Sequence, residues 1–187
     1  MGRVTGRDAD DTRRQIIDAA ARLISRRGSA VSIAAIADAA GVSKGGLLYH
    51  FASKDELLEA VAVSLFDSFR TSVYDAAATD PHPGRLTRAY VRASFAEVAD
   101  EAAAREEIAV AAQLMHEPRI QQLAAADGAR WREELLADGL DPAVVRIVVA
   151  ATDGISAAPL WGSVLAGDDV HALEEQLLAL ASVPGQG

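Results

Sequence analysis

The sequence contains no cysteine, two methionines and only 5% aromatic residues. Without cysteine there can be no disulfide and no thiolate metal site, and the chain suits a reducing cytoplasm. The segment before Thr12 lacks the apolar stretch of a signal peptide. The longest uncharged apolar run, residues 154–167, is shorter than the roughly 18 residues that a membrane-spanning helix needs. We therefore expect a cytoplasmic protein with no membrane segment.

Alternating β-branched runs, which would predict strands, are also scarce. Half of the 187 residues are hydrophobic and alanine is abundant, which favours an all-α fold with a sizeable core. The clearest linker is the cluster of turn-forming residues at 80–84. Helical periodicity and breakers predict about nine helices: residues 12–27, two short helices within 32–51, then 53–78, 85–100, 102–116, 119–137, 142–165 and 168–182, the last capped by Asp168 or Asp169.

The pattern of an enzyme site is missing as well. The four histidines are far apart and form no metal-binding pair, and the glycines at 41–46 do not have the spacing of a phosphate-binding loop. The adjacent glutamate pairs, such as Glu106 and Glu107, diverge by roughly 100° on a helix and form no facing acid–base pair. We therefore expect no enzymatic activity, no cofactor and no metal.

Charge is distributed unevenly along the chain, whose formal net charge is −9. Residues 1–58 carry nine Lys and Arg against seven Asp and Glu, a balance of +2, and include both lysines. Residues 59–187 carry nine basic against twenty acidic groups, a balance of −11. This asymmetry suits a DNA-facing end joined to an acidic body that the DNA backbone would repel.

A segment beginning at Ser32 has the pattern of two short helices around a tight turn. Ser32 suits the first N-cap, and Gly41 can take the left-handed conformation that ends a helix. Ser43 suits the second N-cap, and Leu47 and Phe51, four residues apart, are expected to face the core. This layout is typical of a helix-turn-helix, although a helical hairpin within an all-α core has the same local pattern.

Residues of about 12–58 resemble the N-terminal domain of the tetracycline-repressor (TetR) family of bacterial transcription regulators. The motifs that carry the resemblance occur in the family's order and spacing: residues 16–20, 36–45, Leu47, 50–51 and 53–58. The resemblance implies an all-α homodimer. Its DNA-binding domain would cover residues 1–58, and a long fourth helix would lead into a ligand-binding and dimerisation domain over 59–187.

Two positions depart from the family pattern. Gly46 stands where the family usually has a hydroxyl residue, and Leu48 where it usually has tyrosine, so the usual phosphate contact from that tyrosine is unavailable. Leu48 could instead meet a thymine methyl group. Arg3 and Arg7 are expected to reach DNA as a loose arm. The other candidate DNA-binding residues are Ser32, Ser43, Lys44, Gly45, Gly46, Leu48, Tyr49, His50 and Lys54.

A pocket for a largely apolar small molecule is expected among the middle helices, although each residue chosen for it could equally be plain core. The candidates are Phe69, Tyr90, Phe95, Leu114, Met115, His116, Trp131 and Trp161. The helices over 142–165 and 170–180 are the candidate dimer interface, because the first is apolar on nearly every side. The alternative for these helices is the core of a monomer.

Two functions of different classes fit these patterns. The first is a ligand-responsive transcriptional repressor that binds a near-palindromic double-stranded DNA operator as a homodimer and is released by a small molecule. The second is an all-α adaptor whose helix-turn-helix contacts another protein and not DNA. Binding to specific DNA sequences separates the two.

Overall fold

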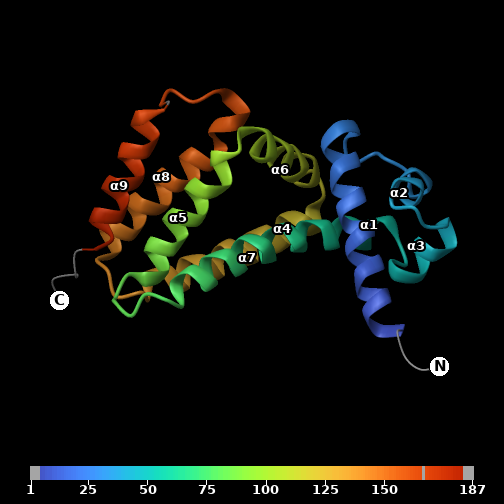
Figure 1. Ribbon diagram of the computed structural model, residues 1–187, viewed down its shortest axis with the longest axis horizontal. Helices are drawn as coiled ribbons and strands as arrows, with labels where there is room; N and C mark the ends of the chain where they lie inside the picture. Colours follow the sequence, from blue (N-terminus) through green and yellow to red (C-terminus); the bar gives the residue numbers. More distant parts are fainter. Residues whose placement is uncertain (1–4, 166, 183–187) are drawn as a thin grey trace. The chain divides into compact units, whose positions relative to one another are not determined.

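The computed structural model describes residues 5–165 and 167–182, and within these ranges the chain forms helices and no strands (Figure 1). This confirms the expected all-α class. The described helices are α1 (Thr5–Arg27), α2 (Ile33–Ala39), α3 (Lys44–His50), α4 (Lys54–Ala77), α5 (Arg85–Ala99), α6 (Glu101–Leu114), α7 (Pro118–Leu136), α8 (Pro142–Trp161) and α9 (Asp168–Leu180).

Most helix ends lie within two residues of the predicted ones, and the start of α1, the end of α8 and the cap of α9 need correction. α1 begins at Thr5, before the expected start at Thr12, because residues 5–11 contain one apolar residue, Ala9, and therefore carry no apolar periodicity. α8 ends at Trp161 and not near Leu165, since Gly162 follows with φ +84°, a conformation outside the helix. Asp168 and Asp169 lie inside the first turn of α9, whose N-cap is Gly167 without a side-chain hydrogen bond.

The described chain divides into two compact units. The first contains the described residues up to Leu65 together with Ala109–Leu123, and the second contains Phe66–Ile108 and the described residues from Ala124 onward. The boundary between the units within α4 follows Leu65, which is seven residues after the domain boundary expected at Leu58. The first unit also takes in a segment of α6 and α7 that sequence patterns did not associate with the helix-turn-helix.

In the first unit, α1 contacts α2, and α2 contacts α3 (Figure 1). Apolar side chains fill its centre, and Leu47 and Phe51 are fully buried, as predicted. Serine side chains cap the short helices: Ser32 Oγ accepts from the amide of Ala35 at 3.2 Å, and Ser43 Oγ from the amide of Gly46 at 3.0 Å. Local caps and apolar packing thus define this unit.

The turn between α2 and α3 is held by glycine geometry and by α1. Gly41 has φ +67°, which confirms the predicted left-handed residue. Gln15 Nε2 donates to the carbonyl of Ala40 at 2.9 Å, and the guanidinium of Arg13 lies 4.8 Å from the centroid of the Phe51 ring. Side chains of α1 therefore fix residues at both ends of the turn–helix segment, a role that sequence patterns did not indicate.

In the second unit, α5 contacts α8 and α9, which also contact each other. Two apolar clusters form its core. One includes Val73, Trp131 and Leu135, and the other includes Val91 and Val148. The second unit also buries all of the described polar or charged residues that are buried: Arg70, Thr87, Arg88, Ser94 and Thr152.

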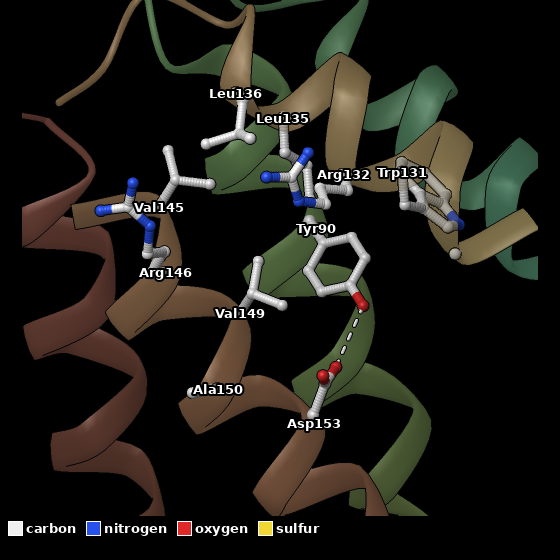
Figure 2. Close-up of a pocket in the computed structure, with 11 residues that line it drawn as sticks. Tyr90, Trp131, Arg132, Leu135, Leu136, Val145, Arg146, Val149, Ala150 and Asp153 are labelled. Carbon is white, nitrogen blue, oxygen red and sulfur yellow. Dashed lines mark hydrogen bonds between the residues drawn. The ribbon is translucent and has the colours of Figure 1, made fainter. Parts of the chain in front are cut away.

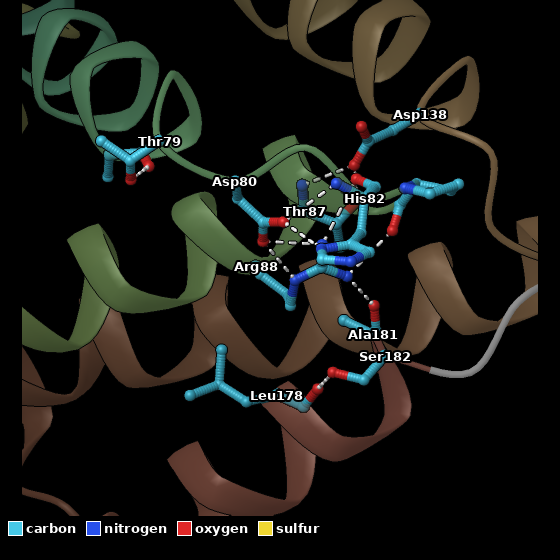
Figure 3. A network of polar contacts seen from close by, with 11 residues as sticks. Thr79, Asp80, His82, Thr87, Arg88, Asp138, Leu178, Ala181 and Ser182 are labelled. Atoms are coloured by element: carbon cyan, nitrogen blue, oxygen red, sulfur yellow. Dashed lines mark hydrogen bonds and ion pairs between the residues drawn. The ribbon is translucent and has the colours of Figure 1, made fainter.

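A polar network around Arg88 joins the start of α5 to the end of α9 (Figure 3). The Arg88 guanidinium pairs with Asp80 at 2.7 Å and donates to the Ala181 carbonyl at 2.6 Å. Gly84, the residue before α5, has φ +83°, and a Cβ there would lie 2.7 Å from the Ala181 oxygen. Glycine is therefore required for α9 to end against this loop.

Helix α8 is more apolar than the uncharged run in the sequence suggested. Among the described residues, Pro142–Leu160 is the one helix long and apolar enough to cross a membrane by length and composition, contrary to our expectation that none is present. The helix carries Arg146 and Asp153, and its buried residues Val145 and Val148 belong to the two core clusters. A core helix passes the same composition test, so the finding is weak evidence for a membrane segment.

Candidate DNA-binding surface and ligand pocket

The outward face of α3 carries the side chains predicted to contact DNA. Tyr49 is 85% exposed, Leu48 is 38% exposed, and Lys44 is exposed one turn earlier. His50 is half-buried, and its ring packs edge-on against Tyr49 at a centroid distance of 5.3 Å. A buried apolar side thus holds this short helix, while an aromatic hydroxyl and a cation project from the other side.

The two glycines of α3 have ordinary helical conformations, so the backbone does not require them. A Cβ at Gly45 would lie 4.0 Å from its nearest neighbour, Ser43 Oγ, which is an ordinary contact. At Gly46 the same oxygen would be 3.2 Å away, which is tight. Because glycine in a helix costs about 1 kcal/mol relative to alanine, Gly45 lowers helix stability without a packing reason within the unit.

Three further candidate residues lie at the starts of α2, α3 and α4. Ser32 and Ser43 use their oxygens as acceptors in the caps, which leaves each hydroxyl hydrogen available to donate. Lys54 is half-buried at the start of α4, where Ser53 Oγ accepts from the amide of Glu56 at 3.1 Å. The Glu56 carboxylate accepts from the Ala52 amide at 2.8 Å, one residue earlier than in the usual capping box. The side chains of Arg3 and Arg7 lie outside the described part of the structure.

The second unit contains an open cavity of about 500 Å³ between α5, α7 and α8 (Figure 2). Its lining is mostly apolar, and Arg132, Arg146 and Asp153 supply the charge. The residues that line it are Tyr90, Gly128, Trp131, Arg132, Leu135, Leu136, Val145, Arg146, Val149, Ala150 and Asp153. Small-molecule sites in proteins have this size and this balance of apolar and polar groups.

Aromatic rings form one wall of this cavity. Phe69, Tyr90 and Trp131 contact one another edge to face, with centroid distances of 5.2 to 5.8 Å. Behind them, the buried guanidinium of Arg70 lies 4.2 Å from the centroid of the Trp131 ring. Arg70 also pairs with Asp127 at 2.7 Å. The position of Trp131 is therefore linked to a charged pair between α4 and α7.

The Tyr90 side chain of this wall also makes a hydrogen bond to a charged residue of the cavity. The Tyr90 hydroxyl donates to Asp153 at 3.3 Å (Figure 2). Burial, together with the charge of Asp153, raises the pKa of the Tyr90 phenol well above its usual value, so the hydroxyl keeps its proton at neutral pH. Asp153 is exposed as a residue, but partial burial of its carboxyl group raises the pKa of Asp153 in spite of this hydrogen bond.

Of the predicted ligand-binding residues, Tyr90 and Trp131 line the cavity and Phe69 contacts both of their rings. Phe95 lies in a core cluster of the same unit. The side chain of Trp161 lies outside the described residues. The remaining three belong to the first unit and do not line this cavity: Leu114 is buried there, whereas Met115 and His116 are exposed.

Sequence patterns missed the charged residues of this cavity. Arg132, Arg146 and Asp153 have the polar character of ordinary surface positions, and only the packing of α7 on α8 brings them together. A stripe of small and apolar residues on α8, including Val145 and Val149, is the one signal that could have indicated a cavity wall on that helix.

Two family descriptions match this chain. "Bacterial regulatory proteins, tetR family" matches residues 16–61, and "Tetracyclin repressor-like, C-terminal domain" matches residues 84–182. The first match covers the helix-turn-helix, and the second covers more than half of the chain, including the cavity.

Individual proteins are similar over different lengths. The helix-turn-helix-type transcriptional regulator TtgR of Pseudomonas putida is 44% identical over 69 residues, which are 36% of this chain and 33% of TtgR. The chain thus spans about a third of the length of this relative. The regulator BetI of Burkholderia thailandensis is 34% identical over 152 residues, which are 78% of this chain and 76% of BetI.

Solved structures agree over nearly the whole chain. The multidrug binding protein EbrR complexed with imidazole is 28% identical, with a TM-score of 0.69 and 98% of each chain covered. A tetR-family member from Streptomyces coelicolor is 29% identical, with a TM-score of 0.70, 92% of this chain covered and 99% of that chain. The order of helices, the buried face of α3 and both halves of the sequence thus lead to one assignment: this chain belongs to the tetR family of bacterial regulatory proteins.

Proposed function

We propose that this protein is a ligand-responsive transcriptional repressor that binds operator DNA in the cytoplasm. The observation that carries the proposal is the two-sidedness of α3. Its Leu47 and the following Phe51 are fully buried, whereas Tyr49 is 85% exposed and has no role in the core. This short helix carries an outward aromatic hydroxyl, a lysine, and a glycine whose missing side chain allows close approach. Such a helix suits the major groove.

The candidate contacts divide into two kinds. Lys54, Ser32 and Ser43 would bind phosphates, which position the protein but do not select sequence. Tyr49 and His50 would contact bases, together with Leu48 against a thymine methyl group. Gly45 and Gly46 would allow the helix to approach the groove closely, and Lys44 would supply a positive charge there.

We further propose that two copies associate through α8 and α9. Support comes from exposed apolar side chains on these helices: Ile147 is 56% exposed, Leu160 47% and Leu180 41%. A two-fold dimer would place two α3 helices roughly 34–36 Å apart, in successive major grooves of a near-palindromic operator. Ile147→Asp should give a monomer by light scattering with its fold intact. A wild-type chain that is already monomeric would contradict this interface.

The effector would occupy the cavity of the second unit. The similar multidrug binding protein EbrR forms complexes with malachite green and with ethidium, which supports a small-molecule ligand for this chain. Release requires the effector to bind more tightly to a state that cannot bind DNA. A ~100-fold loss of operator affinity needs roughly 2.7 kcal/mol of differential binding. We propose that α4, which runs from the first unit into the second, carries this change.

Fluorescence anisotropy with DNA from around the protein's own gene, measured over a series of salt concentrations, tests the proposal. Lys54→Ala should weaken binding to all sequences alike, whereas Tyr49→Ala and His50→Ala should change the preference at particular bases by about 1–3 kcal/mol. Arg92→Ala, on an exposed position of α5, is the matched control and should change neither.

Two results would contradict the proposal. Equal losses for all three variants on every sequence would remove the base-contacting role of Tyr49 and His50. If no duplex sequence binds better than bulk DNA at moderate salt, the result would favour the protein-binding adaptor over the transcriptional regulator.

A further inference from the structure

The charged groups of the cavity in the second unit are separated into two ends. In Figure 2 the Arg132 guanidinium extends from α7 toward α8, on the side where Arg146 lies, and Asp153 lies at the other end beyond Tyr90. Both arginines are exposed, and neither is ion-paired among the described residues. The cavity therefore has a cationic end that its own side chains do not neutralise.

The space between the two ends is apolar. Val149 lies between Arg146 and the Tyr90 ring, and further apolar wall is provided by Leu135, Leu136, Val145 and Ala150. Such a surface gains free energy by covering a hydrocarbon body and offers few partners to a polar one. A ligand that satisfies the whole cavity is therefore charged at one end and apolar along the rest.

The sign of that charge follows from three observations. Two unpaired guanidiniums face the cavity against a single carboxylate. The Asp153 carboxylate already accepts the Tyr90 hydroxyl, so its capacity to hold a cation is shared. The Trp131 ring, which could otherwise attract a cation, already has the Arg70 guanidinium over one face at 4.2 Å. A cationic ligand would meet repulsion from both arginines and one partly occupied partner.

We infer that this cavity binds an amphipathic monoanion, a carboxylate on an apolar body. The carboxylate lies at Arg132 and Arg146, whose N–H groups can donate hydrogen bonds to both of its oxygens. The apolar body extends along Val149 toward the Tyr90 ring. The assignment of this molecule as the effector rests on the proposed function, but its binding can be measured without DNA.

Calorimetric titration of the full chain with three probes that share one decyl body tests the sign directly. The probes are decanoate, 1-decanol and decyltrimethylammonium. Decanoate should bind most tightly, decanol more weakly and the ammonium compound most weakly. Arg132→Gln and Arg146→Gln should each weaken decanoate binding by about tenfold, the loss expected when a charge-assisted hydrogen bond is removed. Their unchanged affinity for decanol would show that the cavity is intact.

Two further variants sharpen the test. Arg130 is also an exposed arginine of α7 but does not line the cavity. Arg130→Gln should therefore leave decanoate binding unchanged. Asp153→Asn keeps an acceptor for Tyr90 and removes the opposing charge, so decanoate affinity should rise by about threefold. A cation site would respond to Asp153→Asn with a loss of ammonium binding instead.

The inference is overturned if the ammonium probe binds as tightly as decanoate, if the arginine variants do not weaken decanoate, or if no probe binds at millimolar concentration. DNA binding is measured separately on the ligand-free protein. Specific DNA binding without decanoate binding would support the regulator function and contradict the anion site. Decanoate binding without specific DNA binding would support the anion site and contradict the regulator function.

Discussion

The two compact units solve the problem of burying side chains in different ways. In the described residues of the first unit no charged or polar residue is buried; its serines cap helices, and Gln15 of α1 holds the turn before α3 by one hydrogen bond. The second unit buries Arg70 and Arg88 and pairs them with carboxylates far away in sequence or across a loop. An apolar core with local caps leaves outward side chains free for a partner, whereas a core with buried ion pairs is sensitive to charge and to displacement of its helices.

The largest effect that this comparison predicts belongs to Arg88. Arg88→Met should lower the free energy of unfolding by about 3–5 kcal/mol, because it leaves Asp80 and the Ala181 carbonyl without their shared partner. Urea denaturation followed by circular dichroism measures the change. Arg92→Met, on an exposed position of the same helix, should stay within about 0.5 kcal/mol. If Arg88→Met costs no more than this control, the ion pair does not hold the second unit together.

The corresponding change in the first unit should be smaller because it removes only a cap. Ser43→Ala should cost about 1 kcal/mol, since the Gly46 amide loses its side-chain acceptor. Ser43→Asp keeps an acceptor and should leave stability near that of the wild type, yet its negative charge should repel phosphate and weaken DNA binding. Thermal unfolding and anisotropy, measured on both variants, separate capping from DNA contact. DNA affinity that follows stability in both variants would assign Ser43 to capping alone.

Gly45 provides a test in which stability and function move in opposite directions. Gly45→Ala should raise stability by about 0.5–1 kcal/mol, because the helical conformation accepts a Cβ and its nearest neighbour is 4.0 Å away. The same methyl group should weaken operator binding by preventing close approach to the groove. Gly128→Ala on α7 also has open space around the added Cβ, and it should raise stability without changing DNA affinity. Unchanged operator binding in Gly45→Ala would show that this glycine has no part in DNA contact.

The first unit could be predicted from sequence more completely than the second, for a physical reason. Caps such as Ser32 and Ser43 and the left-handed Gly41 act within a few residues, so their signals are local and they were found. The carboxylate partners of Arg70 lie 57 and 64 residues away, and no local pattern indicates them.

The candidate sites follow the same division. The outward residues of α3 follow from its periodicity. The cavity depends on how α5, α7 and α8 pack, and of the seven predicted ligand residues whose side chains the structure describes, Tyr90 and Trp131 line it. Arg132 and Arg146, at the cationic end of the cavity, were missed. The sequence around a surface arginine does not indicate which residues of another helix lie opposite it.

The smallest expected effect concerns Glu97 of α5 and depends on pH. Partial burial, with the charge of Glu107 as a second cause, raises the pKa of Glu97 to about 7, although the residue as a whole is exposed. A carboxyl whose pKa is higher in the folded than in the unfolded chain binds its proton more tightly when folded, so stability falls as pH rises from the unfolded value of about 4.5 through 7. Glu97→Gln should therefore reduce the change of the melting temperature with pH between pH 5 and about 8. Glu107→Gln should remove the smaller part of the slope, because it leaves the burial of Glu97 in place. An unchanged slope in Glu97→Gln would show that this carboxyl is open to water, and the pH sensitivity of the second unit would then lie with its buried ion pairs.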